Sequence, residues 1–198
     1  MNKTAGSSKR TDAVTNRARL LTVAQAVFAE SGLDLEVNDI ASRAQLGVGT
    51  LYRHFGNRED LLREIVTRTV EDAQAQIHQA IEPYADDPRA ALQALVSAHL
   101  QVYQQYQPFL AIMRDRRLEK LFEPAHREAM RAQALAPTRG VIERGIQAGI
   151  FREDLDPDLA AAMILGSFIG VLDLLGKSCP LDKLEQQLSQ MLWAMFAK

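Results

Sequence analysis

The chain has 198 residues, of which 47% are hydrophobic and 24% are charged, a composition that is ordinary for a protein with an apolar core. The length suits one domain of average size together with a smaller one. One cysteine, Cys179, excludes an intrachain disulfide and a cysteine-based zinc site, so we predict no metal and no cofactor. The polar N-terminus lacks the apolar segment of a secretory signal, and we therefore expect a cytoplasmic protein.

The formal net charge of −2 is unevenly distributed along the chain. Residues 1–58 hold eight Lys and Arg against five Asp and Glu, a balance of +3, so the remaining residues carry −5. This asymmetry is compatible with an anionic partner at the N-terminal end. A randomly uneven solvated surface would give the same count, and charge alone leaves both interpretations open.

The first elements in chain order are a polar arm and three helices. Residues 1–14 are rich in Ser, Thr, Lys and Arg, which predicts a flexible basic arm. From Thr15 onward, apolar residues recur at helical spacing until Gly32, which should end the first helix. Two short helices follow, at 37–44 and 48–55. Because isolated helices of two turns are marginal in water, both must pack against the first helix.

The later helices are predicted from their start signals. Asn57 offers an N-cap for a long helix that ends before Pro83, and the pairs Asp87-Pro88 and Asp156-Pro157 are typical of two further starts. A last helix should run from about 181 to 197. No stretch alternates like a strand, so we predict an all-α fold of roughly nine helices. We place a helix-turn-helix domain at 15–57 and a second domain at 58–198.

Residues 36–55 carry the most informative pattern. Two short helices joined by a tight turn, with apolar residues spaced to pack on a third helix, indicate a helix-turn-helix whose second helix can enter a DNA major groove about 12 Å wide. Hydroxyl, imidazole and guanidinium groups on that helix can donate to phosphates, and small residues at its leading end allow close approach to bases. The alternative is two structural helices in an arbitrary bundle. The predicted DNA-contacting residues are Arg17, Gly47, Val48, Gly49, Thr50, Tyr52, Arg53, His54 and Arg58.

The segment LGVGTLYRHFGNREDLL, with RARLLTVAQAVFAESG and IASRA before it, resembles the signature of the TetR family of transcriptional regulators. The resemblance covers about Arg17 to Leu62, and it implies that Thr50, Tyr52, His54 and Arg58 contact the DNA backbone. The sequence departs from the family pattern in having Gln45 at the usual turn glycine, Gly47 at a common Ser N-cap, and Glu36 where a Thr often contacts phosphate. We expect Glu36 to point away from DNA. The C-terminal GIFREDLDPDLAAAMILGSFIGVLDLL resembles the branch with an SbtR-like C-terminal domain.

The uncharged run from Leu159 to Leu172 has 14 residues, short of the ~20 that cross a bilayer, so we predict a deeply buried helix and no membrane contact. It is apolar nearly all round, which implies that a partner covers its outer side. The resemblance implies that the helices at 157–176 and 181–197 form a four-helix bundle with a second subunit. The predicted dimer interface comprises Leu165, Gly166, Ile169, Gly170, Leu172, Leu188, Met191, Leu192 and Met195.

The region between 88 and 150 mixes aromatic, Met and His side chains, which at helical spacing are typical of plain core. The resemblance implies instead a cavity for a small-molecule effector, with apolar walls and a few polar groups. The predicted pocket residues are His99, Tyr103, Phe109, Met113, Arg117, Phe122 and Met130.

No catalytic residues are predicted, because the sequence lacks a G-x-S-x-G, a phosphate-binding glycine loop and an H-E-x-x-H. We therefore predict a ligand-responsive repressor that binds a palindromic double-stranded DNA operator as a homodimer and is released by a small-molecule effector. Activation in place of repression stays open. The alternatives are a helical enzyme built on scattered carboxylates and a dimeric binding module without DNA-binding activity.

Overall fold

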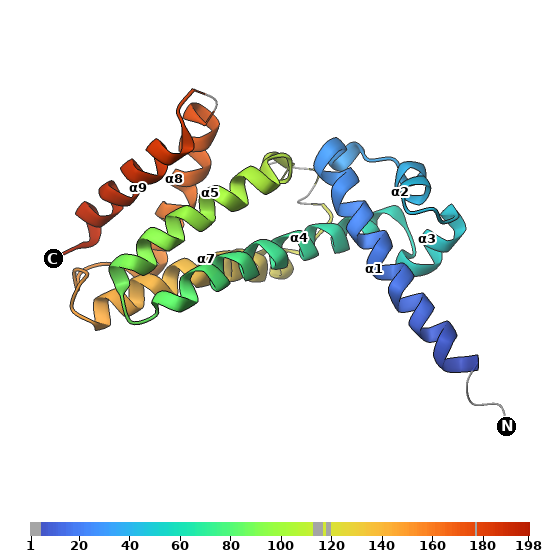
Figure 1. The fold of residues 1–198 in the computed structure, drawn as a ribbon, viewed down its shortest axis with the longest axis horizontal. Coiled ribbons are helices and arrows are strands. Elements are labelled where there is room, and N and C mark those ends of the chain that lie inside the picture. Colours follow the sequence, from blue (N-terminus) through green and yellow to red (C-terminus); the bar gives the residue numbers. More distant parts are fainter. Residues whose placement is uncertain (1–4, 113–116, 118–119, 177) are drawn as a thin grey trace. The chain divides into compact units, whose positions relative to one another are not determined.

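The computed structural model describes residues 5–112, 117, 120–176 and 178–198, with side chains for 16–106, 117, 120–176 and 178–198 (Figure 1). Within these ranges the chain forms α-helices, two 3₁₀ helices (η1 and η2) and no strand, which confirms the predicted all-α fold. The elements are α1 (Ala5–Ser31), η1 (Gly32–Asp34), α2 (Val37–Arg43), α3 (Val48–Phe55), α4 (Arg58–Ile81), η2 (Glu82–Tyr84), α5 (Pro88–Ile112), α7 (Pro124–Gln147), α8 (Pro157–Leu175) and α9 (Leu181–Phe196).

Three predicted helix starts are confirmed as side-chain caps. Oδ1 of Asn57, Asp87 and Asp156 accepts a hydrogen bond from the amide three residues later, at 2.8, 3.0 and 2.8 Å respectively. Each cap satisfies an amide that has no partner within its own helix. These local contacts fix where α4, α5 and α8 begin.

The first helix begins earlier than the predicted start near Thr15, because α1 already includes Ala5. Extending an existing helix costs little once its first turn has formed, and Ala, Lys and Arg in this stretch are good helix formers. The predicted end is confirmed, since α1 stops at Ser31 and Gly32 has a φ of 62°, in the left-handed region that favours glycine.

The chain divides into two compact units. Unit 1 contains Met1–Thr69 and Ala111–Phe122, and unit 2 contains Val70–Leu110 and Glu123–Lys198. In unit 1, α1 packs on η1 and α2, and α2 packs on α3; Figure 1 draws these helices in blue to teal. Their apolar faces form a core that includes Leu20, Ala24, Val27, Phe28, Ile40, Ala41, Leu51 and Phe55.

Unit 2 is a helical assembly built around one continuous apolar cluster. α7 packs on α8, and the cluster draws side chains from the C-terminal half of α4 and from α5, α7, α8 and α9. Phe151, in the connection after α7, is fully buried there. It also forms an isolated antiparallel bridge with Ala197, which ties the end of α9 to this connection.

Within its own chain the uncharged helix is buried on one side only, so deep burial on all sides stays a prediction that depends on a second subunit. α8 buries only the face formed by Ala160, Ala161, Ile164, Phe168 and Leu172, whereas Leu159 and Leu174 are 69% and 82% exposed. One chain covers one side of this helix and leaves its apolar outer side in contact with solvent. By length and composition alone α8 is also apolar enough to cross a membrane, but core helices of soluble proteins pass the same test.

Candidate nucleic-acid interface and ligand sites

The candidate recognition helix is α3, whose inner side anchors it to unit 1. Leu51 and Phe55 are buried, so the intervening residues project away from the core. Arg53 is exposed and Tyr52 is 39% exposed, while Thr50 and His54 are partly buried. Side chains at these positions offer hydroxyl, guanidinium and imidazole donors to a polyanion that lies along the outer side of α3.

The leading end of α3 is open. A β-carbon added at Gly47 or Gly49 would meet no other atom within 4 Å, so neither glycine is required by packing within the described residues. No side chain caps the first amides of the helix, which belong to Val48 and Gly49. A helix N-terminus with free amides and no bulky side chains suits the close approach of an anionic ligand.

The turn before α3 departs from ordinary backbone geometry at Gln45, whose φ is 54°. This left-handed conformation is the reason that a glycine is common here in similar sequences. The amide of Leu46 donates to the carbonyl of Ala41 at 2.9 Å and holds the turn closed. The glutamine therefore adopts the required turn at some cost in strain.

Two of the predicted DNA-contacting cations already make intrachain contacts. Arg17 pairs with Glu64 at 2.5 Å and lies 5.3 Å from the ring centroid of Phe55. Arg58 donates to the backbone carbonyls of Leu33 and Leu35 at 2.5 and 3.5 Å. Both side chains remain exposed, so these contacts orient them without removing them from solvent.

His54 and Glu36 complete the surroundings of α3. The ring of His54 packs edge-on against Phe55, with centroids 6.4 Å apart, and its buried Nε2 has no hydrogen-bond partner in the described structure. Glu36 is exposed at the N-cap of α2 and borders a hollow of about 380 Å³ that Tyr52 and Arg58 also line. The expectation that Glu36 points away from DNA stays a prediction.

Of the predicted pocket residues, His99, Tyr103 and Met130 are buried in unit 2. His99 stacks on Phe168 with ring centroids 5.0 Å apart, and its Nδ1 lies 2.8 Å from the carbonyl oxygen of Leu95. Burial lowers the pKa of His99 below its ordinary value of 6.5, although the bond to the Leu95 carbonyl opposes this shift. The buried Nε2 has no hydrogen-bond partner in the described residues.

The other predicted pocket residues are not brought to His99. Arg117 and Phe122 belong to unit 1, where Arg117 forms an ion pair with Asp34 at 2.7 Å. The side chain of Phe109 and all of Met113 lie outside the described residues. The hydroxyl of Tyr103 donates to Asp173 at 3.3 Å, so this tyrosine connects α5 with α8.

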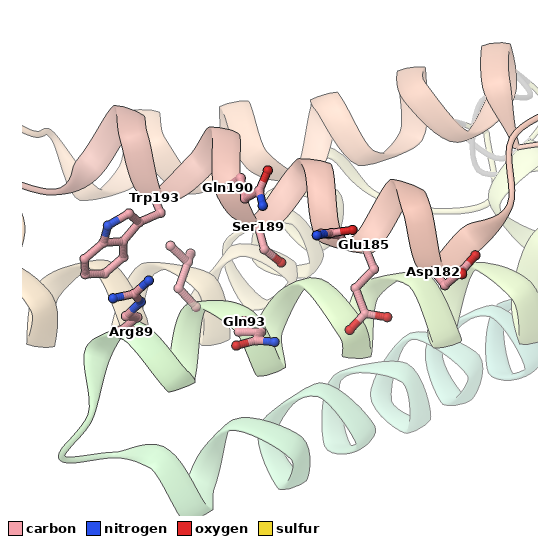
Figure 2. Close-up of a pocket in the computed structure, with 9 residues that line it drawn as sticks. Arg89, Gln93, Asp182, Glu185, Ser189, Gln190 and Trp193 are labelled. Atoms are coloured by element: carbon pink, nitrogen blue, oxygen red, sulfur yellow. The ribbon is translucent and has the colours of Figure 1, made fainter.

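A polar groove of about 450 Å³ lies between α5 and α9 and was not predicted (Figure 2). Arg89 lies 4.8 Å from the ring centroid of Trp193 at one end, and Asp182 lies toward the other. Between them the close-up shows Gln93, Glu185 and Ser189, all of which carry polar groups. Most of the lining side chains are exposed to water, which solvates them without a ligand.

The predicted dimer interface needs correction at three positions. Leu172, Leu188 and Leu192 are buried in the apolar cluster of their own chain, because they lie on the inner sides of α8 and α9. Other predicted members lie outward, with Gly166 exposed and Met191 62% exposed. Sequence reasoning missed four exposed apolar residues of α8: Leu159, Met163, Leu174 and Leu175.

The outer side of α8 also contains both glycines of the uncharged run. A β-carbon at Gly166 or Gly170 would meet no other atom within 4 Å. A glycine inside a helix costs roughly 0.5–1 kcal/mol relative to alanine, and nothing in the described part of the chain requires it here. An outer face that is apolar, exposed and lined by glycine is suited to close contact with another helix.

Comparisons with known proteins place these features in one family. Residues 20–65 match the family described as "Bacterial regulatory proteins, tetR family", and residues 85–173 match "Tetracyclin repressor-like, C-terminal domain". That second description is general, so the likeness to an SbtR-like branch stays a prediction. The transcriptional repressor KstR2 of Rhodococcus jostii is 31% identical over 160 residues, which are 79% of this chain and 75% of that protein.

Comparison with solved structures leads to the same family. The ketosteroid transcriptional regulator KstR2 of Mycobacterium tuberculosis superposes with a TM-score of 0.67 at 27% identity, covering 92% of this chain and 95% of that one. A putative TetR-family regulator from Mesorhizobium loti has a TM-score of 0.76 at 21% identity, covering 94% and 98% of the two chains, and shows a shared fold. These relatives are regulators, which sets aside the helical-enzyme alternative. The chain therefore belongs to the TetR family of bacterial transcriptional regulators.

Proposed function

We propose that the protein is a repressor that binds a palindromic DNA operator as a homodimer and releases it when a small molecule binds. The open leading end of α3 is the observation that carries this proposal, because Gly47 and Gly49 have no packing role in the described structure. Their small size would allow DNA to approach the backbone of α3 closely. Operator binding also assigns the protein to the cytoplasm, where the DNA is.

The DNA contacts that we propose are those predicted from the sequence. Tyr52 and Arg53 are exposed on α3, and Thr50 is partly exposed beside them. Arg17 and Arg58 are held near the two ends of the motif by their intrachain contacts. Because these groups recognise phosphates, they set affinity and register more than base preference.

The second subunit joins through the outer faces of α8 and α9. This face contains Leu159, Met163, Gly166 and Leu174 from α8, with Met191 from α9. Burying exposed apolar area of this kind is the main favourable contribution to stable association. A two-fold dimer presents two copies of α3, which suits half-sites separated by about one DNA turn, 34–36 Å, or a multiple of it.

The effector should bind in unit 2, and His99 is the best-placed predicted contact. Its Nδ1 faces a carbonyl oxygen, which accepts hydrogen bonds only, so the ring proton resides on Nδ1 and the buried Nε2 is an acceptor. A ligand with a hydroxyl or N–H donor would satisfy it. Effector binding should then weaken operator affinity, and operator binding should weaken effector affinity by the same factor, about 5- to 150-fold or 1–3 kcal/mol.

The test measures operator affinity by fluorescence anisotropy at fixed salt, using the operator selected from random double-stranded DNA by the purified protein. Tyr52→Ala and His54→Ala should each weaken binding by about 1–3 kcal/mol, as expected for a lost hydrogen bond to a charged group. Arg131→Ala, on an exposed surface of α7, is the matched control and should bind normally. Unchanged affinity in both α3 variants would favour a dimeric module that does not bind DNA through this helix.

A further inference from the structure

A second groove of unit 2, between α4 and α7, contains none of the predicted pocket residues. Its volume is about 500 Å³, and its walls are mainly apolar. A cavity of this size is in the range that accommodates small organic ligands. The lining residues are Glu71, Gln74, Ala75, His78, Ile81, Glu82 and Ala85 on the α4 and η2 side and Gln133, Ala136, Pro137, Gly140 and Arg144 on α7.

Two of the lining residues, Gln74 and Arg144, each hold a buried hydrogen-bond donor without a partner in the described structure. The two donor atoms are Nε2 of Gln74 and Nε of Arg144. A buried donor without an acceptor destabilises the folded state, and it does so more strongly when the donor is charged. Both atoms are donors, so the group that would satisfy them is an acceptor.

Arg144 differs from two other arginines on the same helix. Arg131 pairs with Glu128, and Arg139 pairs with Glu143 and Asp158. Arg144 is half-buried and forms no ion pair with a described residue, so its charge is not fully hydrated and has no direct ionic partner among these residues. A cation in such surroundings favours an anion as its partner.

The local sequence of α7 makes room for this guanidinium. A β-carbon on Gly140 would lie 3.4 Å from Nη1 of Arg144, so the side chain folds back along the helix over the glycine. Pro137, one turn earlier, has no amide hydrogen and cannot donate to the carbonyl of Gln133. A helical glycine and a helical proline both disfavour α7, yet both lie on the side that lines the groove.

We propose that this groove binds a small monocarboxylic acid, with its carboxylate on Arg144 and Gln74 and its apolar body against Ala75, Ala136 and Pro137. The guanidinium and the amide would each supply a donor to the carboxylate, which satisfies both buried atoms at once. Glu71 and Glu82 are exposed residues whose carboxylates line the same groove, so they repel a second negative charge on the ligand. Monocarboxylates are therefore preferred to dicarboxylates and phosphates.

Calorimetric titration of decanoate into the full-length, DNA-free protein tests this proposal, with methyl decanoate as the uncharged comparison. Decanoate should bind more tightly than its ester. Arg144→Gln should weaken decanoate binding by at least about tenfold, the usual effect of losing a charged hydrogen bond. Gln74→Leu should weaken it less, and Arg131→Gln, which alters a paired arginine on the same helix, should leave it unchanged.

A second variant keeps both donors and fills the space. Ala75→Trp should abolish decanoate binding with Arg144 still present, and thermal melting of each variant without ligand should show a single cooperative transition. The proposal fails if decanoate gives no heat of binding at millimolar concentration, or if the wild type and Arg144→Gln bind it equally. The titration contains no DNA, so its result does not depend on operator binding. Carboxylate binding can therefore be disproved while operator binding is supported, and the reverse is also possible.

Discussion

The ring of Phe151 occupies the space that any side chain at Gly145 would need. A β-carbon on Gly145 would lie 2.0 Å from Cδ2 of that ring, far inside van der Waals contact. The amide of Phe151 also donates to the carbonyl of Gly145 at 2.9 Å, so the chain after α7 folds back over the glycine. This close approach fixes how the connection from α7 to α8 enters the core of unit 2.

Gly145→Ala should therefore destabilise the protein by about 1–3 kcal/mol or more, because the methyl group forces a fully buried ring to move. Gly140→Ala on the same helix is the control, since its β-carbon meets only a flexible guanidinium at 3.4 Å and alanine favours the helix. Urea unfolding monitored by circular dichroism compares the two. Equal midpoints would contradict the steric argument.

Gly49→Ala should separate stability from DNA binding. Alanine in α3 raises helix stability by roughly 0.5–1 kcal/mol, and the new methyl group enters open space. If DNA lies against the leading end of α3, the same methyl group weakens operator affinity. We expect a higher melting temperature together with weaker binding by anisotropy. A variant that gains stability and keeps full affinity would place DNA elsewhere.

Aspartate substitutions should distinguish the inner and outer sides of α8. Leu174→Asp, at an 82% exposed position, should yield a folded monomer with weak operator affinity, because it places a charge on the proposed dimer face. Leu172→Asp places a charge in the core and should prevent folding. Analytical ultracentrifugation and circular dichroism report the two effects. A dimeric Leu174→Asp variant would argue that this face lies outside the interface.

His99 should make stability depend on pH. Burial lowers its pKa in the folded state, so below pH 6.5 the unfolded chain binds more protons than the folded one. Stability is therefore complete above about pH 6.5 and falls as the pH drops toward the folded-state pKa, by up to about 1.4 kcal/mol per pH unit. In the His99→Phe variant, the free energy of unfolding should decrease less as the pH falls, because this titration is absent. Urea unfolding measures the free energy of unfolding of both proteins between pH 7.5 and 5. An equal decrease in the wild type and in His99→Phe would contradict this role of His99.

Helix boundaries could be predicted from the sequence because they depend on neighbours along the chain. Asn57, Asp87 and Asp156 cap the helices that they were expected to start, and α3 spans the predicted residues. The turn at Gln45 was recognisable as well, as a position where a glycine is usual, and its positive φ agrees with that interpretation. Interactions between residues close in the sequence are therefore sufficient to predict helix ends and tight turns.

The orientation of side chains between distant segments was less predictable. Arg117 was placed in the effector pocket, yet it pairs with Asp34, more than eighty residues earlier in the chain. Leu188 was placed at the dimer interface, yet it is buried in its own chain, since apolar spacing does not say which surface covers a helix. Gln74 and Arg144 meet at one groove for the same reason. Gly140 and Pro137 inside α7 were the signals that could have indicated it.

The boundaries of the two units have a consequence for how the molecule unfolds. The chain passes from one unit to the other after Thr69, inside α4, after Leu110, inside α5, and again after Phe122, just before α7. The crossing at Thr69 lies within α4, so neither unit can lose its structure at that point without fraying a helix that the other uses. Melting of one unit should therefore propagate into the other, and heat should unfold the protein in a single cooperative step. A cut after Thr69, made to isolate the proposed DNA-binding unit, would divide α4.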